Sequence, residues 1–281
     1  MAPALRLATW HAGAGDNVRI TPLYRSPVVS LGAFWCAPDD VRWEQENHVG
    51  EVAHIAFPAT PVWIDVQGGG PVLAGPNHAM FFNAGDVFHR RRFNGHGDRN
   101  LFMVVGDGTM GEWLRGARFP RPVGKLLPRP FLTVRALARA LRRGADGLAV
   151  EERLLELGHA TVTGAFGSGD DRRPRTPAAV EEVKAVLAER YAERLSLDAL
   201  GRAVNVSPFH LARSFRRHTG YTLHGYQTHL RLRAALERLT TGDEDVAAIA
   251  RAVGYSSHSH LTASFRRIFG VPPSRARALL V

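Results

Sequence analysis

The chain has 281 residues, 45% of them hydrophobic, and a formal net charge of +10 at pH 7. This length predicts two domains with separate cores, and the excess of basic residues favours a polyanionic partner. The single cysteine, Cys36, excludes an intramolecular disulfide and a zinc site built from cysteines. No apolar run approaches the roughly 18 residues that span a bilayer, and no signal-peptide pattern opens the chain, so we expect a cytoplasmic protein without membrane contact.

Short apolar or alternating segments fill the region from about residue 18 to residue 108, and Pro, Gly, Asn and Asp separate them. This alternation predicts strands joined by turns, with a hairpin turn at Gly68-Gly69-Gly70. Many short strands with regular turn signals favour a closed or sandwiched β fold. The predicted strands are 28–31, 52–57, 62–66, 72–73, 79–82, 87–88 and 101–105.

The pattern changes to helical spacing beyond residue 130. Val134, Leu137 and Leu141 predict one helix, and a second short helix is expected from Val150 to Leu157. This helical pair has two readings that the sequence leaves equal, because its apolar stripe either seals the β domain or forms a homodimer interface.

A stretch without apolar periodicity follows over residues 161–177, and its Gly, Ser, Asp, Arg and Pro content predicts a linker. We therefore expect a first domain over 1–160 and a second over 178–281. The second domain is expected to be all helical, because its apolar residues keep a helical spacing to the end of the chain.

Helix start and stop signals divide the second domain. Ser196, Ser207 and Ser257 are the expected N-caps, and Pro208 suits the first turn of the helix that Ser207 opens. A long connecting helix is expected through Leu230 to Leu239, with Gly242 closing it. The predicted order is one entry helix followed by two short helix pairs on either side of a connecting helix.

The two helix pairs share a phrase. Leu211-Ala-Arg-Ser-Phe-Arg-Arg-His-Thr-Gly220 recurs as Leu261-Thr-Ala-Ser-Phe-Arg-Arg-Ile-Phe-Gly270. Each copy has a Leu and a Phe four residues apart, which places both on one buried helix face. Each also follows a short helix and a turn, which is the pattern of a helix-turn-helix unit with its second helix in the DNA major groove.

The second helix-turn-helix unit contains Ile249-Ala250, Gly254-Tyr255, Ser257, Phe265-Arg266-Arg267 and Gly270 followed by Pro273-Ser274-Arg275; the first contains Leu200, Ala203, Ser207, Leu211, Phe215 and Gly220. Through these residues, the chain from about 178 to 280 resembles the DNA-binding domain of the AraC/XylS family of bacterial transcription regulators. The resemblance implies a sequence-specific regulator that binds double-stranded DNA, with activation and contact to RNA polymerase as associated expectations.

The recognition helices offer two classes of DNA contact. Residues near the helix N-termini are expected to read bases, and Arg213 is the best single candidate because Arg pairs bidentately with guanine. Ala212 and Ala263 lack a hydrogen-bond donor, so the second unit is expected to be the poorer reader. The predicted base contacts are Phe209, Ala212, Arg213, His258, Ser259 and Thr262. The predicted phosphate contacts are Arg216, Arg217, Arg266 and Arg267, where the alternative is a salt bridge within the domain; Arg231 and Arg233 carry the same ambiguity.

The β-rich segment Gly75 to His89, with its Asn-Ala-Gly-Asp turn, resembles the cupin-like sensor domain that often precedes this DNA-binding domain. The resemblance implies a small β-barrel with room for one small-molecule effector. Metal and other cofactors are not expected, because the two-histidine spacing of metallocupins is missing from this region. The histidines available there are His48, His54, His78, His89 and His96, near Glu51. The aromatics that either line a pocket or form core are Trp35, Trp43, Trp63, Phe81, Phe82 and Phe88.

The sequence thus predicts an α+β chain, with a cupin-like β-barrel and helical hairpin followed by an all-α domain with two helix-turn-helix motifs. The favoured function is a ligand-responsive DNA-binding regulator that is not an enzyme. Two alternatives stay open: a metal-dependent cupin enzyme with a helical appendage, and a regulator whose first domain is purely structural. Cys36 is expected to be a buried small residue, with redox sensing as its other reading.

Overall fold

The computed structural model describes residues 17–114, 118–145, 147–167, 176–241 and 244–280. The chain forms two compact units, Met1–Arg172 and Arg173–Val281. Their boundary falls within the stretch that the sequence marks as a linker. None of the described helices is both long enough and apolar enough to cross a bilayer.

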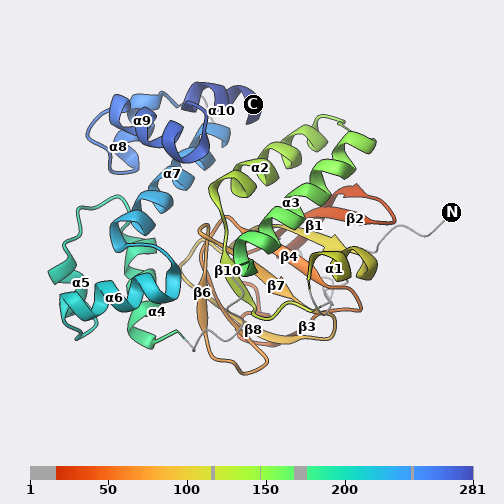
Figure 1. Ribbon diagram of the computed structural model, residues 1–281, viewed down its shortest axis with the longest axis horizontal. Coiled ribbons are helices and arrows are strands. Elements are labelled where there is room, and N and C mark those ends of the chain that lie inside the picture. Colours follow the sequence, from red (N-terminus) through yellow and green to blue (C-terminus); the bar gives the residue numbers. More distant parts are fainter. Residues whose placement is uncertain (1–16, 115–117, 146, 168–175, 242–243, 281) are drawn as a thin grey trace. The chain divides into compact units, whose positions relative to one another are not determined.

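The described strands of the first unit form two antiparallel sheets (Figure 1). They follow the sandwiched alternative of the expected β fold, since the described strand ladders do not join into one closed barrel. One sheet has the order β1 (Val18–Arg25), β2 (Val29–Cys36), β9 (Asp98–Val105), β4 (His54–Pro58), β7 (His78–Phe82) and β10 (Val123–Lys125), and the other has the order β3 (Glu46–His48), β8 (Val87–Arg92), β5 (Val62–Val66) and β6 (Val72–Ala74).

The two faces of the larger sheet meet different partners. On one face Phe34, Phe82 and Phe102 join Ile64 and Phe88 of the smaller sheet in the core between the sheets. The other face meets helix α3. Because the central strands β4 and β7 are buried on both faces, they read as continuous apolar runs and not as alternating ones.

The described residues of the first unit include three helices: α1 (Asp107–Trp113), α2 (Pro128–Arg142) and α3 (Leu148–Phe166). The rings of Phe81 and Phe166 lie 4.6 Å apart, which places the end of α3 against the larger sheet. Val134 and Leu137 of α2 are buried, and α2 lies beside α3 (Figure 1). The stripe of α2 therefore covers the unit's own core, as one of its two predicted roles required.

Helix α3 corrects the sequence-based boundary. It runs nine residues beyond Leu157, so residues 161–166 are helix and not linker. Thr161 and Val162 are buried, and Thr161 Oγ1 donates a 2.7 Å hydrogen bond to the Leu157 carbonyl inside the helix. The local signal for a helix is weak there, because Thr and Gly dilute the apolar stripe that Phe166 completes.

The expected strands and the hairpin turn are present, with Gly68 and Gly70 at positive φ between β5 and β6. Four elements of the first unit were not predicted individually: β1, β3, α1 and β10. The strands β3 and β10 are only three residues long, and β3 is polar and largely exposed. They form because β8 and β7 offer them a hydrogen-bonding edge, which a local pattern does not encode.

The second unit is helical throughout its described residues. The long helix α7 joins two helix pairs, α5–α6 and α8–α9 (Figure 1). The first half packs around Leu187, Leu211 and Phe215, and the second half buries Leu261 and Phe265. Its helices are α4 (Ala178–Glu189), α5 (Leu197–Ala203), α6 (Pro208–Thr219), α7 (Leu223–Thr241), α8 (Val246–Ala252), α9 (His258–Phe269) and α10 (Pro273–Leu280). Gly242, expected to close α7, lies outside the described residues.

Candidate nucleic-acid interface

Side-chain caps fix where both recognition helices begin. Ser207 Oγ accepts a hydrogen bond from the His210 amide at 3.3 Å to open α6, and Ser257 Oγ accepts one from the His260 amide at 3.2 Å to open α9. Ser196 caps α5 in the same way. These caps confirm the three predicted serines, and each satisfies a helix N–H that would otherwise lack a partner.

Each recognition helix buries the face that its apolar pair predicts. Leu211 and Phe215 of α6 are 1% and 0% exposed, and Leu261 and Phe265 of α9 are both 0% exposed. Both helices end at a glycine in the left-handed region, Gly220 and Gly270. The expected structural role of the repeated Leu and Phe is therefore confirmed.

The predicted base-contact residues of the first helix-turn-helix unit lie together on the side of α6 opposite its buried face. Phe209 is 77% exposed although it is a large apolar residue, and Arg213 is exposed beside it, with Ala212 half-buried. These three residues, with Arg216, line one side of a hollow of about 730 Å³. An exposed Phe next to a free Arg on a capped helix is suited to contact with base edges and the thymine methyl group.

The corresponding side of α9 is more polar. His258 and Ser259 are exposed at its N-terminal end, and Thr262 is half-buried one turn later. His260 packs against Tyr255 with ring centroids 5.0 Å apart, which fastens the helix to the preceding turn. The second helix-turn-helix unit therefore presents short hydroxyl and imidazole groups where the first helix-turn-helix unit presents an aromatic ring and a guanidinium.

The four predicted phosphate-contact arginines, Arg216, Arg217, Arg266 and Arg267, are all exposed. In the described part of the chain none of their guanidinium groups donates a hydrogen bond to, or forms an ion pair with, another residue. A salt bridge within the domain, the alternative role, is not formed by the described residues. Contact with phosphate stays the prediction for all four.

The connecting-helix arginines have structural roles, which the sequence left ambiguous. Arg231 Nε donates to the Tyr191 carbonyl at 2.6 Å and Arg231 Nη2 to the Glu193 carbonyl at 2.8 Å. These bonds hold the residues that follow α4 against α7. Arg233 is fully buried. Sequence reasoning also missed Arg194 and His224, which line the same hollow as Arg213; neither lies in the repeated phrase.

The first unit does not bring its candidate metal ligands together. His54 is buried and stacks on Phe82 with centroids 4.7 Å apart, whereas His48 is exposed and pairs with Glu46. His78 accepts a hydrogen bond from the Gly75 amide at Nδ1, and His89, His96 and Glu51 lie on the surface. Among the described residues, no three His, Cys, Asp or Glu side chains gather as a metal site would require.

The candidate pocket aromatics divide between the two sides of the sandwich. Trp43, Phe82 and Phe88 belong to the core between the sheets. Trp35 and Trp63 instead lie under Arg19 and Arg91, each with its guanidinium 5.4 Å from the ring centroid, and Phe81 packs on α3. Because side chains alternate along a strand, these last three cannot line a pocket between the sheets.

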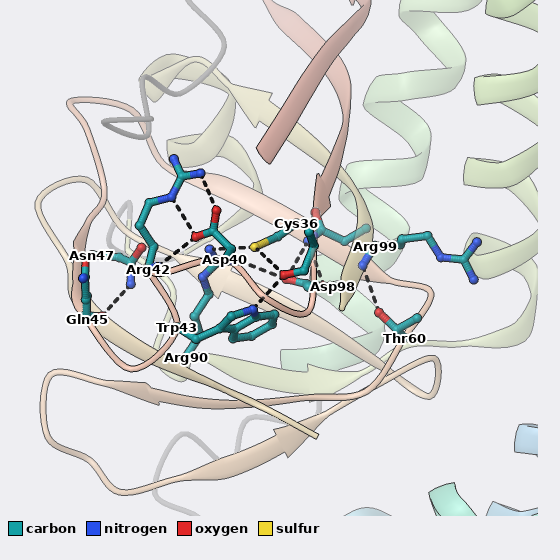
Figure 2. Close-up of polar contacts among 12 residues, drawn as sticks. Cys36, Asp40, Arg42, Trp43, Gln45, Asn47, Thr60, Arg90, Asp98 and Arg99 are labelled. Atoms are coloured by element: carbon teal, nitrogen blue, oxygen red, sulfur yellow. Dashed lines mark hydrogen bonds and ion pairs between the residues drawn. The ribbon is translucent and has the colours of Figure 1, made fainter. Parts of the chain in front are cut away.

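A charged cluster is buried at one end of the sandwich (Figure 2). The guanidinium of Arg90 lies between the rings of Phe34 and Trp43, 5.2 and 4.8 Å from their centroids. It donates a 3.3 Å hydrogen bond to Cys36 Sγ and lies 3.7 Å from Asp98 Oδ2. Arg90 is 4% exposed, so the pair needs these contacts to offset the loss of water.

Burial dominates the acid–base properties of this region. It raises the pKa of Asp98 to about 6, although Arg90 acts in the opposite direction. It lowers the pKa of His54 to about 4. Burial also raises the pKa of the Cys36 thiol. A thiol of raised pKa without solvent access is a poor nucleophile, which agrees with the expected role of Cys36 as a buried small residue.

Comparison with known proteins places the second unit. Residues 200–278 match a family model described as a helix-turn-helix domain. Over 111 residues, 40% of this chain, the sequence is 30% identical to the HTH-type transcriptional activator RhaS of Pectobacterium atrosepticum. Over 98 residues, 35% of this chain, it is 30% identical to the MmsAB operon regulatory protein of Pseudomonas aeruginosa. The chain spans 38% and 32% of the lengths of these two relatives.

Among solved structures, a transcriptional regulator with an AraC-type DNA-binding domain from Chromobacterium violaceum is 29% identical. That alignment covers 36% of this chain and 89% of the other, with a TM-score of 0.35. The match to the family model covers the two capped helix-turn-helix units described above. The second unit thus contains a helix-turn-helix domain and is similar to these regulators, which agrees with the resemblance to the AraC/XylS family noted in its sequence.

Proposed function

We propose that the chain is a sequence-specific transcription regulator that binds double-stranded DNA through its second unit. The observation that carries the proposal is the pair of capped recognition helices, each with a buried apolar face and an exposed face bearing unpaired arginines. Two such helices in one unit suit successive major-groove faces, which lie about 34 Å apart along the duplex. The RhaS relatives are named activators, which favours activation as the outcome.

Within this proposal the two ends of each recognition helix act differently. In the first helix-turn-helix unit the bases are read by Phe209, Ala212 and Arg213. In the second helix-turn-helix unit they are read by His258, Ser259 and Thr262. The four arginines toward the C-terminal ends, Arg216, Arg217, Arg266 and Arg267, contact phosphates. Phosphate contacts set the register of the protein on the duplex, and base contacts carry the sequence preference.

The first unit is proposed to bind a small organic effector between its sheets and to pass its occupancy on to the second unit. The first unit, with α3 to its end at Phe166, would thus form the effector-binding and dimerisation domain, and 178–281 the DNA-binding domain. Such control requires an effector that binds two states of the protein with different affinity. Contact with RNA polymerase and a cytoplasmic site of action follow from the same proposal.

A metal-dependent cupin enzyme is the weaker alternative. Its ligands would have to come from residues that the fold keeps apart, since His54 is buried between the sheets while His48, His89 and His96 lie on the surface. The named relatives are regulators. A first unit without any ligand is the other alternative, and a thermal-shift screen of small organic molecules on residues 1–172, which include all of α3, separates it from a sensor.

Selection of bound duplexes from a random pool tests the proposal. The full chain should enrich one motif, and its affinity should fall steeply with salt as counterions are released. Arg213→Ala should cost about 1–3 kcal/mol and relax one base position, whereas Arg217→Ala should weaken all sequences alike. A folded chain that shows no salt-dependent DNA binding would overturn the proposal, and an unchanged motif with Arg213→Ala would remove Arg213 from the base-reading set.

A further inference from the structure

The hollow beside α6 is built by four segments of the second unit. Phe209, Ala212, Arg213 and Arg216 of α6 form one side of it. The remaining lining comes from the end of α4, from α5 with the residues before it, and from the beginning of α7 with the residue before it: Leu187, Arg194, Leu195, Leu197, Leu200, Thr222, Leu223, His224, Gln227 and Arg231. Only the α6 side was expected from the repeat.

The lining is cationic and contains no carboxylate. Arg194 and Arg231 lie close enough for their charges to repel, since Arg194 lowers the pKa of Arg231 in addition to the larger effect of burial. Arg231 is committed to backbone carbonyls, whereas Arg194 and His224 are exposed. In the described part of the chain Arg194 and His224 form no hydrogen bond or ion pair, so they are available to an anion.

Hydrogen bonds anchor the backbone next to both residues. Gln227 Nε2 donates to the Tyr191 and Glu193 carbonyls at 3.1 and 2.8 Å, and Arg231 bonds the same segment. The residue that follows this segment is Arg194. At the other side, Thr222 Oγ1 accepts a 3.0 Å hydrogen bond from the Gly225 amide, which fixes the first turn of α7 that carries His224.

We propose that one strand of the DNA duplex runs through this hollow, with Arg194 and His224 contacting its backbone phosphates while Arg213 reads its bases. The proposal rests on the proposed function, and it names phosphate contacts outside both recognition helices. A strand whose bases meet α6 must pass the other sides of the same hollow. The absence of carboxylates from the lining favours a polyanion there, and Leu195, Leu197 and Leu223 offer apolar surface to the deoxyribose rings.

The second helix-turn-helix unit provides an internal comparison. Counting back from the N-caps Ser196 and Asp245, the position of Arg194 corresponds to Asp243. Counting forward from the closing glycines Gly220 and Gly270, the position of His224 corresponds to Ser274. The second helix-turn-helix unit thus has an acid in place of the cation and a hydroxyl in place of the imidazole. The additional phosphate contacts are therefore proposed for the first helix-turn-helix unit alone.

Arg194→Gln in the full chain tests the proposal on the motif recovered by selection. Loss of one phosphate contact reduces the slope of log affinity against log salt by about 0.9, so the loss of affinity between 50 and 200 mM salt should shrink by roughly three- to fourfold. His224→Ala should weaken specific and random duplexes alike, by roughly fivefold. The matched control is Arg202→Gln, which removes an exposed arginine of α5 that pairs with Asp198 and lies outside the hollow.

Duplexes with a neutral methylphosphonate at single positions locate the contact. At one position the methylphosphonate should weaken DNA binding by the unaltered protein and should not weaken binding by the Arg194→Gln variant any further. The proposal is overturned if no position behaves in this way, or if Arg194→Gln and Arg202→Gln give the same salt slope. A full chain that binds no duplex would instead reject the proposed function, and circular dichroism of each variant verifies that it is folded.

Discussion

Gly254→Ala is the substitution whose cost the structure defines best. Gly254 ends α8 with φ +83°, in the left-handed region, and a Cβ added there would lie 2.1 Å from the Ala192 carbonyl oxygen. Ala192 is one of the residues that Arg231 holds against α7, and Arg231 also lies 6.0 Å from the Tyr255 ring centroid. Gly254 therefore allows the turn of the second helix-turn-helix unit to meet the segment that leaves α4.

Two separate costs add at this position. A residue with a Cβ in the left-handed region loses about 1–2 kcal/mol. Overpacking adds about 1–3 kcal/mol, and relief is limited because the nearest atoms are all backbone. Gly270 is the matched control: its φ is +81°, and an added Cβ would meet no atom within 4 Å. We expect Gly254→Ala to destabilise the second unit by about 2–5 kcal/mol and Gly270→Ala by only about 1–2 kcal/mol.

Hydrogen exchange of the full chain, followed by mass spectrometry, measures the difference within the second unit. Gly254→Ala should speed exchange in α8, in α9 and at residues 191–193, whereas Gly270→Ala should affect chiefly the end of α9. Equal destabilisation by the two substitutions, to within about 0.5 kcal/mol, would refute the close approach between Gly254 and Ala192.

Three further predictions concern buried side chains. Phe215→Ala and Phe265→Ala should each lose about 3–5 kcal/mol of stability, visible in circular dichroism melting; lost DNA binding with an unchanged melting temperature would place them on the DNA face. Leu137→Asp should unfold the first unit, because Leu137 lies on the buried face of α2; if the protein stays folded and light scattering shows a smaller assembly, this stripe is a dimer contact. Protonated Asp98 contributes to the stability of the first unit below pH 4, and this contribution is lost as the pH rises through about 6. Neutral His54 contributes stability above pH 6.5, and about 3 kcal/mol of it is lost as the pH falls through about 4. The two oppose each other, so Asp98→Asn should make the first unit's calorimetric melting temperature fall clearly between pH 6.5 and 4; a flat profile contradicts this.

Local signals were sufficient for most of the second unit. Ser196, Ser207 and Ser257 cap their helices because a hydroxyl three residues before an amide satisfies it without help from the rest of the fold. Leu211 and Phe215 are buried because a spacing of four residues places them on one helix face. The same reasoning underestimated α3, where small residues weaken the stripe although packing against the sheet keeps residues 161–166 helical.

The sequence by itself determined the two repeated units, their caps and their buried faces, because each depends on residues within one helical turn. Tertiary structure alone decided which distant residues share a surface. Arg194 lies at the hollow beside Arg213 because Arg231 and Gln227 fasten the residues that follow α4 to α7, and His224 lies there because it is in the first turn of α7. In the first unit, likewise, the pairing of strands far apart in the chain decides which aromatics face the core between the sheets. Such contacts follow from how elements pack, and no local periodicity encodes them.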